Sequence, residues 1–156
     1  MSIEDGTNQA SSSPAPSDSP ESEARIRANI LIYNPQKGYG RALENMLQSA
    51  YSSVSNTDSD KKLMDQLRDP NNEIDFIILE NYDETIPELD FINRIRQLEH
   101  RMTSPIILIV PSRGQNFEKA TKINRKRENL FIVQRPCDLT KIQRIIREAK
   151  KDNKLA

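Results

Sequence analysis

The chain has 156 residues, and its 23 acidic side chains balance its 23 basic ones. This length fits one domain with an extension, and the balanced charge gives no indication of binding to nucleic acid or to an anionic membrane. The longest apolar run, residues 106–110, is far shorter than the roughly 20 residues that span a bilayer. With one cysteine and no signal-peptide pattern, a reducing cytoplasmic compartment is expected, with the nucleus as an alternative.

The first 24 residues differ in composition from the rest, since they consist mostly of Ser, Pro, Asp and Glu. Such a segment buries too little apolar surface to offset its ordering entropy, so disorder is predicted. It contains Ser13-Pro14 and Ser19-Pro20, pairs of the type that proline-directed kinases modify. Whether Ser13 or Ser19 is phosphorylated stays open, and a solubilising leader is the simpler interpretation. We therefore divide the chain into a tail at 1–24, a domain at 25–150 and a polar tail at 151–156.

Apolar runs and helical spacings alternate through the first half of the domain. The run at 30–33 predicts a buried strand, and apolar residues at helical spacing follow over 43–50. A short strand at 53–54 is only weakly indicated. Asp58 or Ser59 can cap a second helix, which the Asp69-Pro70 pair ends before the next apolar run at 76–79.

The same alternation continues to the end of the domain. A helix is predicted over 87–101, a strand over 106–110, a shorter and more polar helix over 117–123, a strand over 130–133 and a last helix over 138–149. Five strand–helix units in this order predict a flavodoxin-like α/β domain, with a doubly wound, five-stranded parallel sheet and helices on both faces. In such sheets ligands bind at the carboxyl ends of the strands.

Two segments carry a family resemblance. Residues 135–139, Arg-Pro-Cys-Asp-Leu, resemble the Lys-Pro-Phe-Asp-Leu stretch before the last helix of response regulator receiver domains, and residues 103–107 resemble the opening of that family's fourth strand. The resemblance covers Ala28 to about Ala149 and implies a (βα)5 receiver fold in a two-component signalling system.

The positions that carry receiver chemistry hold different residues here. Asn34 and Pro35 replace the two acidic residues that hold Mg²⁺, and Glu80 replaces the phosphate-accepting Asp. Val110 stands at the Ser or Thr position and Arg135 at the Lys position. Because Mg²⁺ prefers carboxylate oxygens, this degenerate pocket predicts no metal site and no cofactor. The resemblance therefore indicates a non-enzymatic pseudo-receiver.

We expect Glu80 and Arg135 to form a fixed ion pair in place of the phosphate–Lys contact, which would hold one conformation permanently. The aromatic switch position of the family is Ile132, which agrees with this expectation. The alternative is that Glu80 is a solvated carboxylate at a loop edge.

Basic residues follow the fourth predicted helix and line the last one. The resemblance implies that this face docks a protein, for example a histidine kinase, a phosphotransfer protein or an effector. A solvated helix face is the default interpretation. The expected docking residues are Lys122, Arg125, Lys126, Arg127, Ile132, Arg144 and Arg147.

Other functions stay open at this point. The chain could be a phosphorylatable atypical receiver of a phosphorelay, a structural subunit, or a small-ligand binder on a flavodoxin-like fold. The pathway, the oligomeric state (a homodimer is one alternative) and whether the chain is a fragment of a longer protein are not readable from the sequence.

Overall fold

The computed structural model describes residues 25–36, 40–80, 88–110, 129–135 and 139–155. The described strands are β1 (Ile26–Tyr33), β2 (Tyr51–Thr57), β3 (Phe76–Glu80), β4 (Ile106–Val110) and β5 (Leu130–Gln134). The described helices are α2 (Gly40–Gln48), α3 (Asp60–Arg68), α4 (Glu88–Arg96), the short 3₁₀ helix η3 (Glu99–Arg101) and α7 (Leu139–Leu155).

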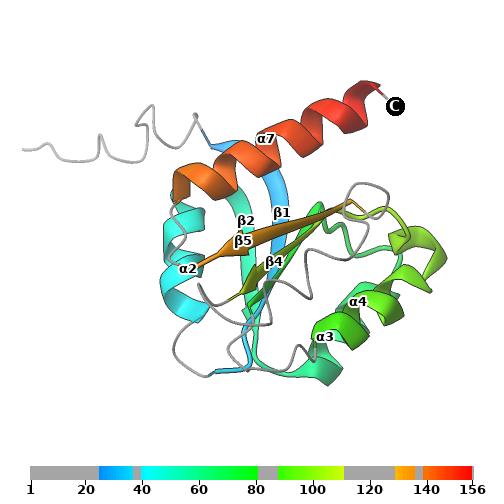
Figure 1. Cartoon of the computed structure of the whole chain (residues 1–156). Coiled ribbons are helices and arrows are strands. Elements are labelled where there is room, and N and C mark those ends of the chain that lie inside the picture. The colour runs from blue at the N-terminus through cyan, green and yellow to red at the C-terminus, as the bar shows by residue number, and fades with distance from the viewer. Residues whose placement is uncertain (1–24, 37–39, 81–87, 111–128, 136–138, 156) are drawn as a thin grey trace, which may run out of the picture.

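The strands form one parallel sheet in the order β2-β1-β3-β4-β5 (Figure 1). The first crossover places β2 on one edge, and the chain then crosses β1 and winds outward to β5. This is the doubly wound, flavodoxin-like arrangement that the sequence predicts, so the fold prediction is confirmed. It brings the carboxyl ends of all five strands to the same edge of the sheet.

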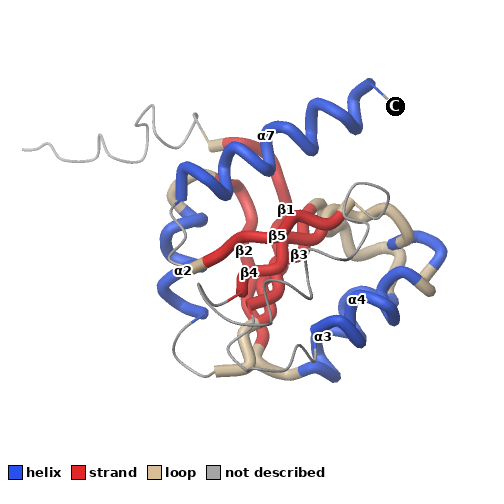
Figure 2. The backbone as a smooth tube through the Cα atoms, in the orientation of Figure 1, coloured by secondary structure: helices blue, strands red, loops and turns tan. Residues whose placement is uncertain are grey.

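Alternate residues of the central strands enter two separate cores, as the pleat of a strand requires. Leu31, Ile77 and Leu108 pack with residues of α3 and α4 on one face. Ile30 and Ile78 pack with residues of α2 and α7 on the other. Figure 2 shows the two helix pairs on opposite sides of the sheet. Every residue of β3 and β4 is buried, which explains why their sequences are continuously apolar up to Glu80.

Helix α3 begins as expected, because Ser59 is its N-cap and the Ser59 side chain accepts a hydrogen bond from the Lys62 backbone N–H (3.2 Å). The predicted strand at 53–54 is the centre of the longer strand β2. This strand is hard to recognise because it lies at the sheet edge, where four of its seven residues are exposed. Residues 151–155, which we expected to belong to a polar tail, continue helix α7.

The helix predicted over 87–101 is wrong in its second half. Helix α4 ends at Arg96, and Leu98 is extended (φ −81°, ψ 118°) before η3 begins. The break turns the buried Arg101 towards the loop after α3. There its guanidinium donates to the backbone carbonyls of Leu67 (3.1 Å) and Asn72 (2.7 Å). A continuous helix would carry Arg101 away from those carbonyls, so the long-range hydrogen bonds outweigh the local helical pattern.

Several predictions fall on residues outside those that the structure describes. They are the tail at 1–24, the helix over 117–123, and Lys122, Arg125, Lys126 and Arg127 of the expected docking face. Among the described helices, none combines the length and apolarity needed to cross a membrane.

Candidate functional site at the carboxyl edge of the sheet

Strand register places Asn34 beside Glu80. Tyr33 of β1 pairs with Leu79 of β3, and Asn34 and Glu80 each follow by one residue. The Asn34 side-chain Nδ2 donates a hydrogen bond to Glu80 Oε2 over 2.6 Å, and both residues are buried, with 1% and 6% of their surfaces exposed. Glu80 is therefore an interior carboxylate, and the alternative of a solvated group at a loop edge is wrong.

The ion pair expected from the sequence is present. Arg135 directly follows β5, and its backbone N–H donates to the Val110 carbonyl (2.8 Å), which extends the β4–β5 ladder by one residue. Its Nη2 lies 3.6 Å from Glu80 Oε1, so the contact is an ion pair and is longer than a hydrogen bond. Because β4 separates β3 from β5, the two backbones are two strand spacings apart, or about 9.6 Å. Only two long side chains can bridge that distance, and Glu and Arg together do so.

The amide of Asn34 is held in one orientation. Its Oδ1 accepts a hydrogen bond from the Gln36 backbone N–H (2.9 Å), an Asx turn, and its backbone N–H donates to the Thr57 carbonyl (2.9 Å) at the end of β2. The amide N–H₂ consequently faces Glu80, and the amide oxygen faces the loop after β1. Asn34 thus presents a donor where a metal site would need an acceptor.

Two of the five predicted pocket residues do not join this cluster. Pro35 is exposed. Val110 is fully buried and belongs to the core between the sheet and helices α3 and α4, and its backbone carbonyl is what meets Arg135. The structure therefore brings together Asn34, Glu80 and Arg135, and we call these three residues the polar cluster.

The polar cluster does not fit the Mg²⁺ that the receiver resemblance implies. Mg²⁺ requires a near-octahedral set of oxygen ligands at about 2.0–2.1 Å, usually including carboxylates. Here the single carboxylate accepts a hydrogen bond at Oε2 and faces a guanidinium at Oε1. The guanidinium of Arg135 adds a positive charge beside this one carboxylate, which disfavours a divalent cation there. Within the described ranges, no three His, Cys, Asp or Glu side chains gather as a metal site.

The described part of the expected docking face lies at β5 and α7. Ile132 is half-buried against the core on the α3 and α4 side, and Arg144 and Arg147 are exposed on α7. Their neighbours in the prediction are outside the described residues, so the structure does not bring the whole set together.

Sequence reasoning missed two buried polar groups. Arg101 donates to carbonyls of the 67–74 loop, and burial lowers its pKa although the Asp69 carboxylate opposes that shift. Tyr51 is almost fully buried, and its hydroxyl has no hydrogen-bond partner among the described residues. Burial raises the pKa of Tyr51, and Arg147 opposes the rise. One sequence signal could have indicated that Arg101 is buried. Apolar residues stand three and six positions before it, at Leu98 and Ile95.

No protein-family model matches the sequence, and no curated protein matches it either. Solved structures do match. A response regulator receiver protein from Pseudomonas putida superposes with a TM-score of 0.62 and 19% identity, over 79% of this chain and 98% of that one. A second, from Sinorhizobium medicae, gives a TM-score of 0.59 and 14% identity, over 80% and 93% of the two chains. The chain has a receiver-like fold.

A structure described as an adenylate cyclase from Rhodopirellula baltica is also similar. Its TM-score is 0.68 at 14% identity, and the match covers 83% of this chain and 92% of that one. At this identity, each of the three likenesses shows the fold alone.

Proposed function

We propose that this chain is a pseudo-receiver: a non-enzymatic protein-interaction module in signal transduction that works without being phosphorylated. The observation that carries the proposal is the burial of the Glu80 carboxylate together with its two contacts. The side chain at the end of β3 is buried, accepts a hydrogen bond at Oε2 from Asn34, and forms an ion pair at Oε1 with Arg135.

The polar cluster is poorly suited to phosphoryl transfer. That reaction depends on positioning and on cations that neutralise the charge of the phosphoryl group. An attacking carboxylate must also be free to approach the phosphorus, and the Glu80 oxygens are already engaged. Asn34 and Pro35 supply no anionic oxygen for a metal. The chemistry of the residues present thus favours a structural role for this edge.

The same contacts support a fixed conformation. Asn34, Glu80 and Arg135 tie together the ends of β1, β3 and β5, across the centre of the sheet. A pre-formed ion pair of this kind provides permanently what a receiver would gain only transiently. We infer that the module presents one surface to its partners, and that proteins such as a histidine kinase, a phosphotransfer protein or an effector recognise it at β5 and α7.

The direct test is to incubate the full chain with acetyl phosphate and Mg²⁺ and to measure intact mass. The proposal predicts no stable gain in mass. A gain of one phosphate that disappears in Glu80→Gln would contradict it and favour the phosphorylatable alternative. A gain that persists in Glu80→Gln would indicate modification elsewhere, so Glu80→Gln serves as the matched control.

A thermal-shift screen with nucleotides and flavins tests the small-ligand alternative. A bound ligand raises the apparent stability by mass action, by about 2.7 kcal/mol at a hundred times its Kd. The pseudo-receiver proposal predicts no shift. A saturable shift would favour the ligand binder.

A further inference from the structure

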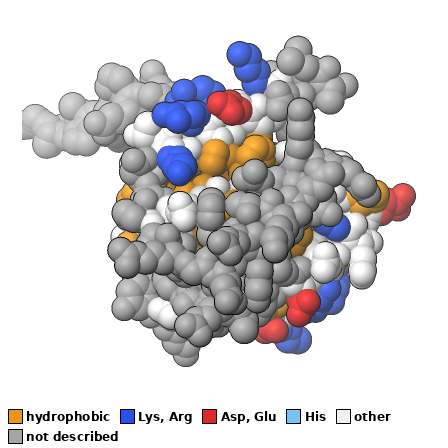
Figure 3. Space-filling model, in the orientation of Figure 1, with side chains coloured by type: hydrophobic (Ala, Val, Ile, Leu, Met, Phe, Trp, Pro, Cys, Tyr) orange, Lys and Arg blue, Asp and Glu red, His pale blue; other side chains and the backbone are white. Residues whose placement is uncertain are grey.

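A group of exposed cations lies on helix α7 and at the start of β1, at the opposite end of β1 from Asn34. Arg144, Arg147 and Lys151 follow one another at i, i+3 and i+7, so they form one stripe on α7. Arg25 and Arg27 lie at the start of β1. All five are exposed, and we call them the basic patch. Figure 3 shows Lys and Arg side chains gathered along α7.

Contacts place helix α7 beside the start of β1. Lys150 Nζ donates to the Arg27 carbonyl over 2.7 Å, which holds α7 against the start of β1. Ile26 pairs with Tyr51 in the sheet. The positive charge of Arg147 acts on the Tyr51 hydroxyl and opposes the rise of its pKa. The cationic stripe on α7 therefore lies beside the point where the chain enters β1.

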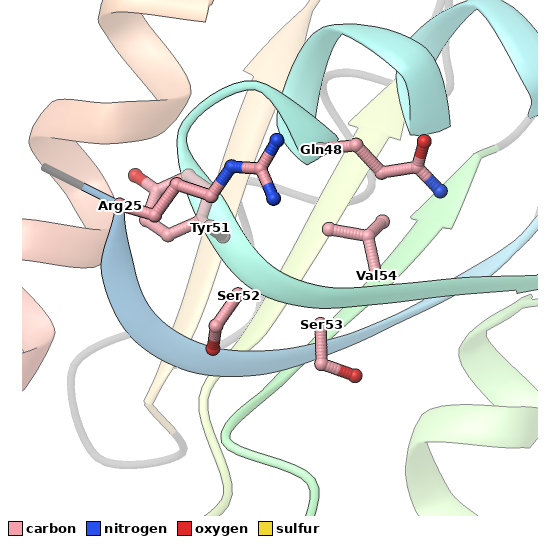
Figure 4. Close-up of a pocket in the computed structure, with 6 residues that line it drawn as sticks. All are labelled: Arg25, Gln48, Tyr51, Ser52, Ser53 and Val54. Carbon is pink, nitrogen blue, oxygen red and sulfur yellow. The ribbon is translucent and has the colours of Figure 1, made fainter. Parts of the chain in front are cut away.

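Arg25 also borders a shallow hollow of about 350 Å³ with Gln48, Tyr51, Ser52, Ser53 and Val54. In Figure 4 its guanidinium extends over this hollow towards Gln48.

The described residues of the basic patch and its surroundings carry an excess of positive charge. None of its five side chains takes part in a described salt bridge. Glu148 is the acidic side chain described on the same part of α7, and it is exposed. The like charges of Arg144, Arg147 and Lys151 repel one another, and an anionic segment that covers them would relieve this repulsion.

The chain itself carries such a segment, directly attached to Arg25. Residues 1–24 contain five acidic residues and no Lys or Arg, which gives a formal charge of −5 from Glu4, Asp5, Asp18, Glu21 and Glu23. Asp18, Glu21 and Glu23 lie within seven residues of Arg25. A fully extended segment of seven residues is about 25 Å long. The stripe from Arg144 to Lys151 is only about 10 Å long.

We propose that the acidic segment 18–24 docks on the basic patch of its own chain. Exposed ion pairs are individually weak, but a segment tethered beside its site has an effective concentration in the millimolar range or above. The docked segment would cover Arg144 and Arg147, which the proposed function assigns to partner binding, so it would regulate access to that surface. Phosphorylation of Ser13 or Ser19 would add about −1.5 to −2 charges per site and strengthen docking.

Limited proteolysis of the full chain with a glutamate-specific protease tests this proposal, because cleavage after Glu21 and Glu23 reports how often the segment is undocked. We expect the triple variant R144Q/R147Q/K151Q to be cleaved there at least about threefold faster than the wild type, the lower bound that three exposed ion pairs set. The matched control K61Q/K62Q/R68Q neutralises three exposed cations of α3 and should match the wild type.

Salt provides the second arm. From about 0.01 M to about 1 M salt the Debye length shortens from about 30 Å to about 3 Å, so the protection should disappear in the wild type and be absent throughout in the patch variant. Equal cleavage of the wild type and the patch variant at low salt would overturn the proposal and leave the basic patch to a separate acidic partner. No partner or phosphodonor is present in this test, so its failure would not bear on the pseudo-receiver proposal.

Discussion

Replacing Arg135 by Met removes the counter-charge of a buried carboxylate, and the structure gives the size of the effect. At the observed 3.6 Å between Nη2 and Oε1, an effective dielectric constant of about 20 gives a gross attraction of about 4–5 kcal/mol. Breaking a buried ion pair by removing one partner costs about 3–5 kcal/mol. Because a quarter of the Arg135 side chain is exposed, we expect the lower end, about 3 kcal/mol of unfolding free energy at pH 7.

Urea denaturation of R135M and of the double variant E80Q/R135M measures this coupling. In the double variant, the amide oxygen of Gln can still accept the hydrogen bond from Asn34, and no charge is left buried. We therefore expect most of the lost stability to return. In R135M alone, acid should reduce the loss, since a protonated Glu80 needs no counter-charge. A loss below about 0.5 kcal/mol that does not change with pH is the result typical of a solvated surface pair, and it would refute this reasoning.

Three further predictions concern other described residues. Tyr51→Phe should raise the unfolding free energy by about 1 kcal/mol in urea denaturation, because it removes a buried hydroxyl without a described partner. Since burial raises the pKa of Tyr51, the unfolded chain ionises first above about pH 10, so the wild type should lose stability there and Y51F should lose less. Arg101→Lys should lower the unfolding free energy by about 2–3 kcal/mol, because an ammonium cannot reproduce the planar guanidinium that donates to four backbone carbonyls. An unchanged urea midpoint would contradict this. The triple variant N34D/P35D/E80D should gain Mg²⁺ binding measurable by calorimetry, whereas equal heats from variant and wild type would show that the donor set is not what is missing.

The sequence was sufficient to predict the sheet because the buried strands are continuous apolar runs with polar residues at their ends. Asn34, Glu80 and Arg135 could be placed at one edge for the same reason. The orientation of the Asn34 amide was not predictable, since it depends on a hydrogen bond from Gln36 and on a carboxylate 46 residues away. Val110 was placed in the pocket by resemblance, but the pleat directs it into the opposite core.

The boundaries that sequence reasoning missed have a common physical cause. Helix α4 ends early because Arg101 satisfies carbonyls about 30 residues earlier in the chain, which no local pattern records. Strand β2 is half exposed at the sheet edge, so its composition is that of a surface loop. In both places, long-range contacts decide the structure over local periodicity.

The most direct test of the central claim is the amide NMR spectrum of the uniformly labelled chain during a Mg²⁺ titration, with and without acetyl phosphate. If Asn34, Glu80 and Arg135 form a permanently closed cluster, their amide resonances will stay in place at every Mg²⁺ concentration. Saturable shifts at these three residues, increased further by the phosphodonor, would show an open receiver site and contradict the account.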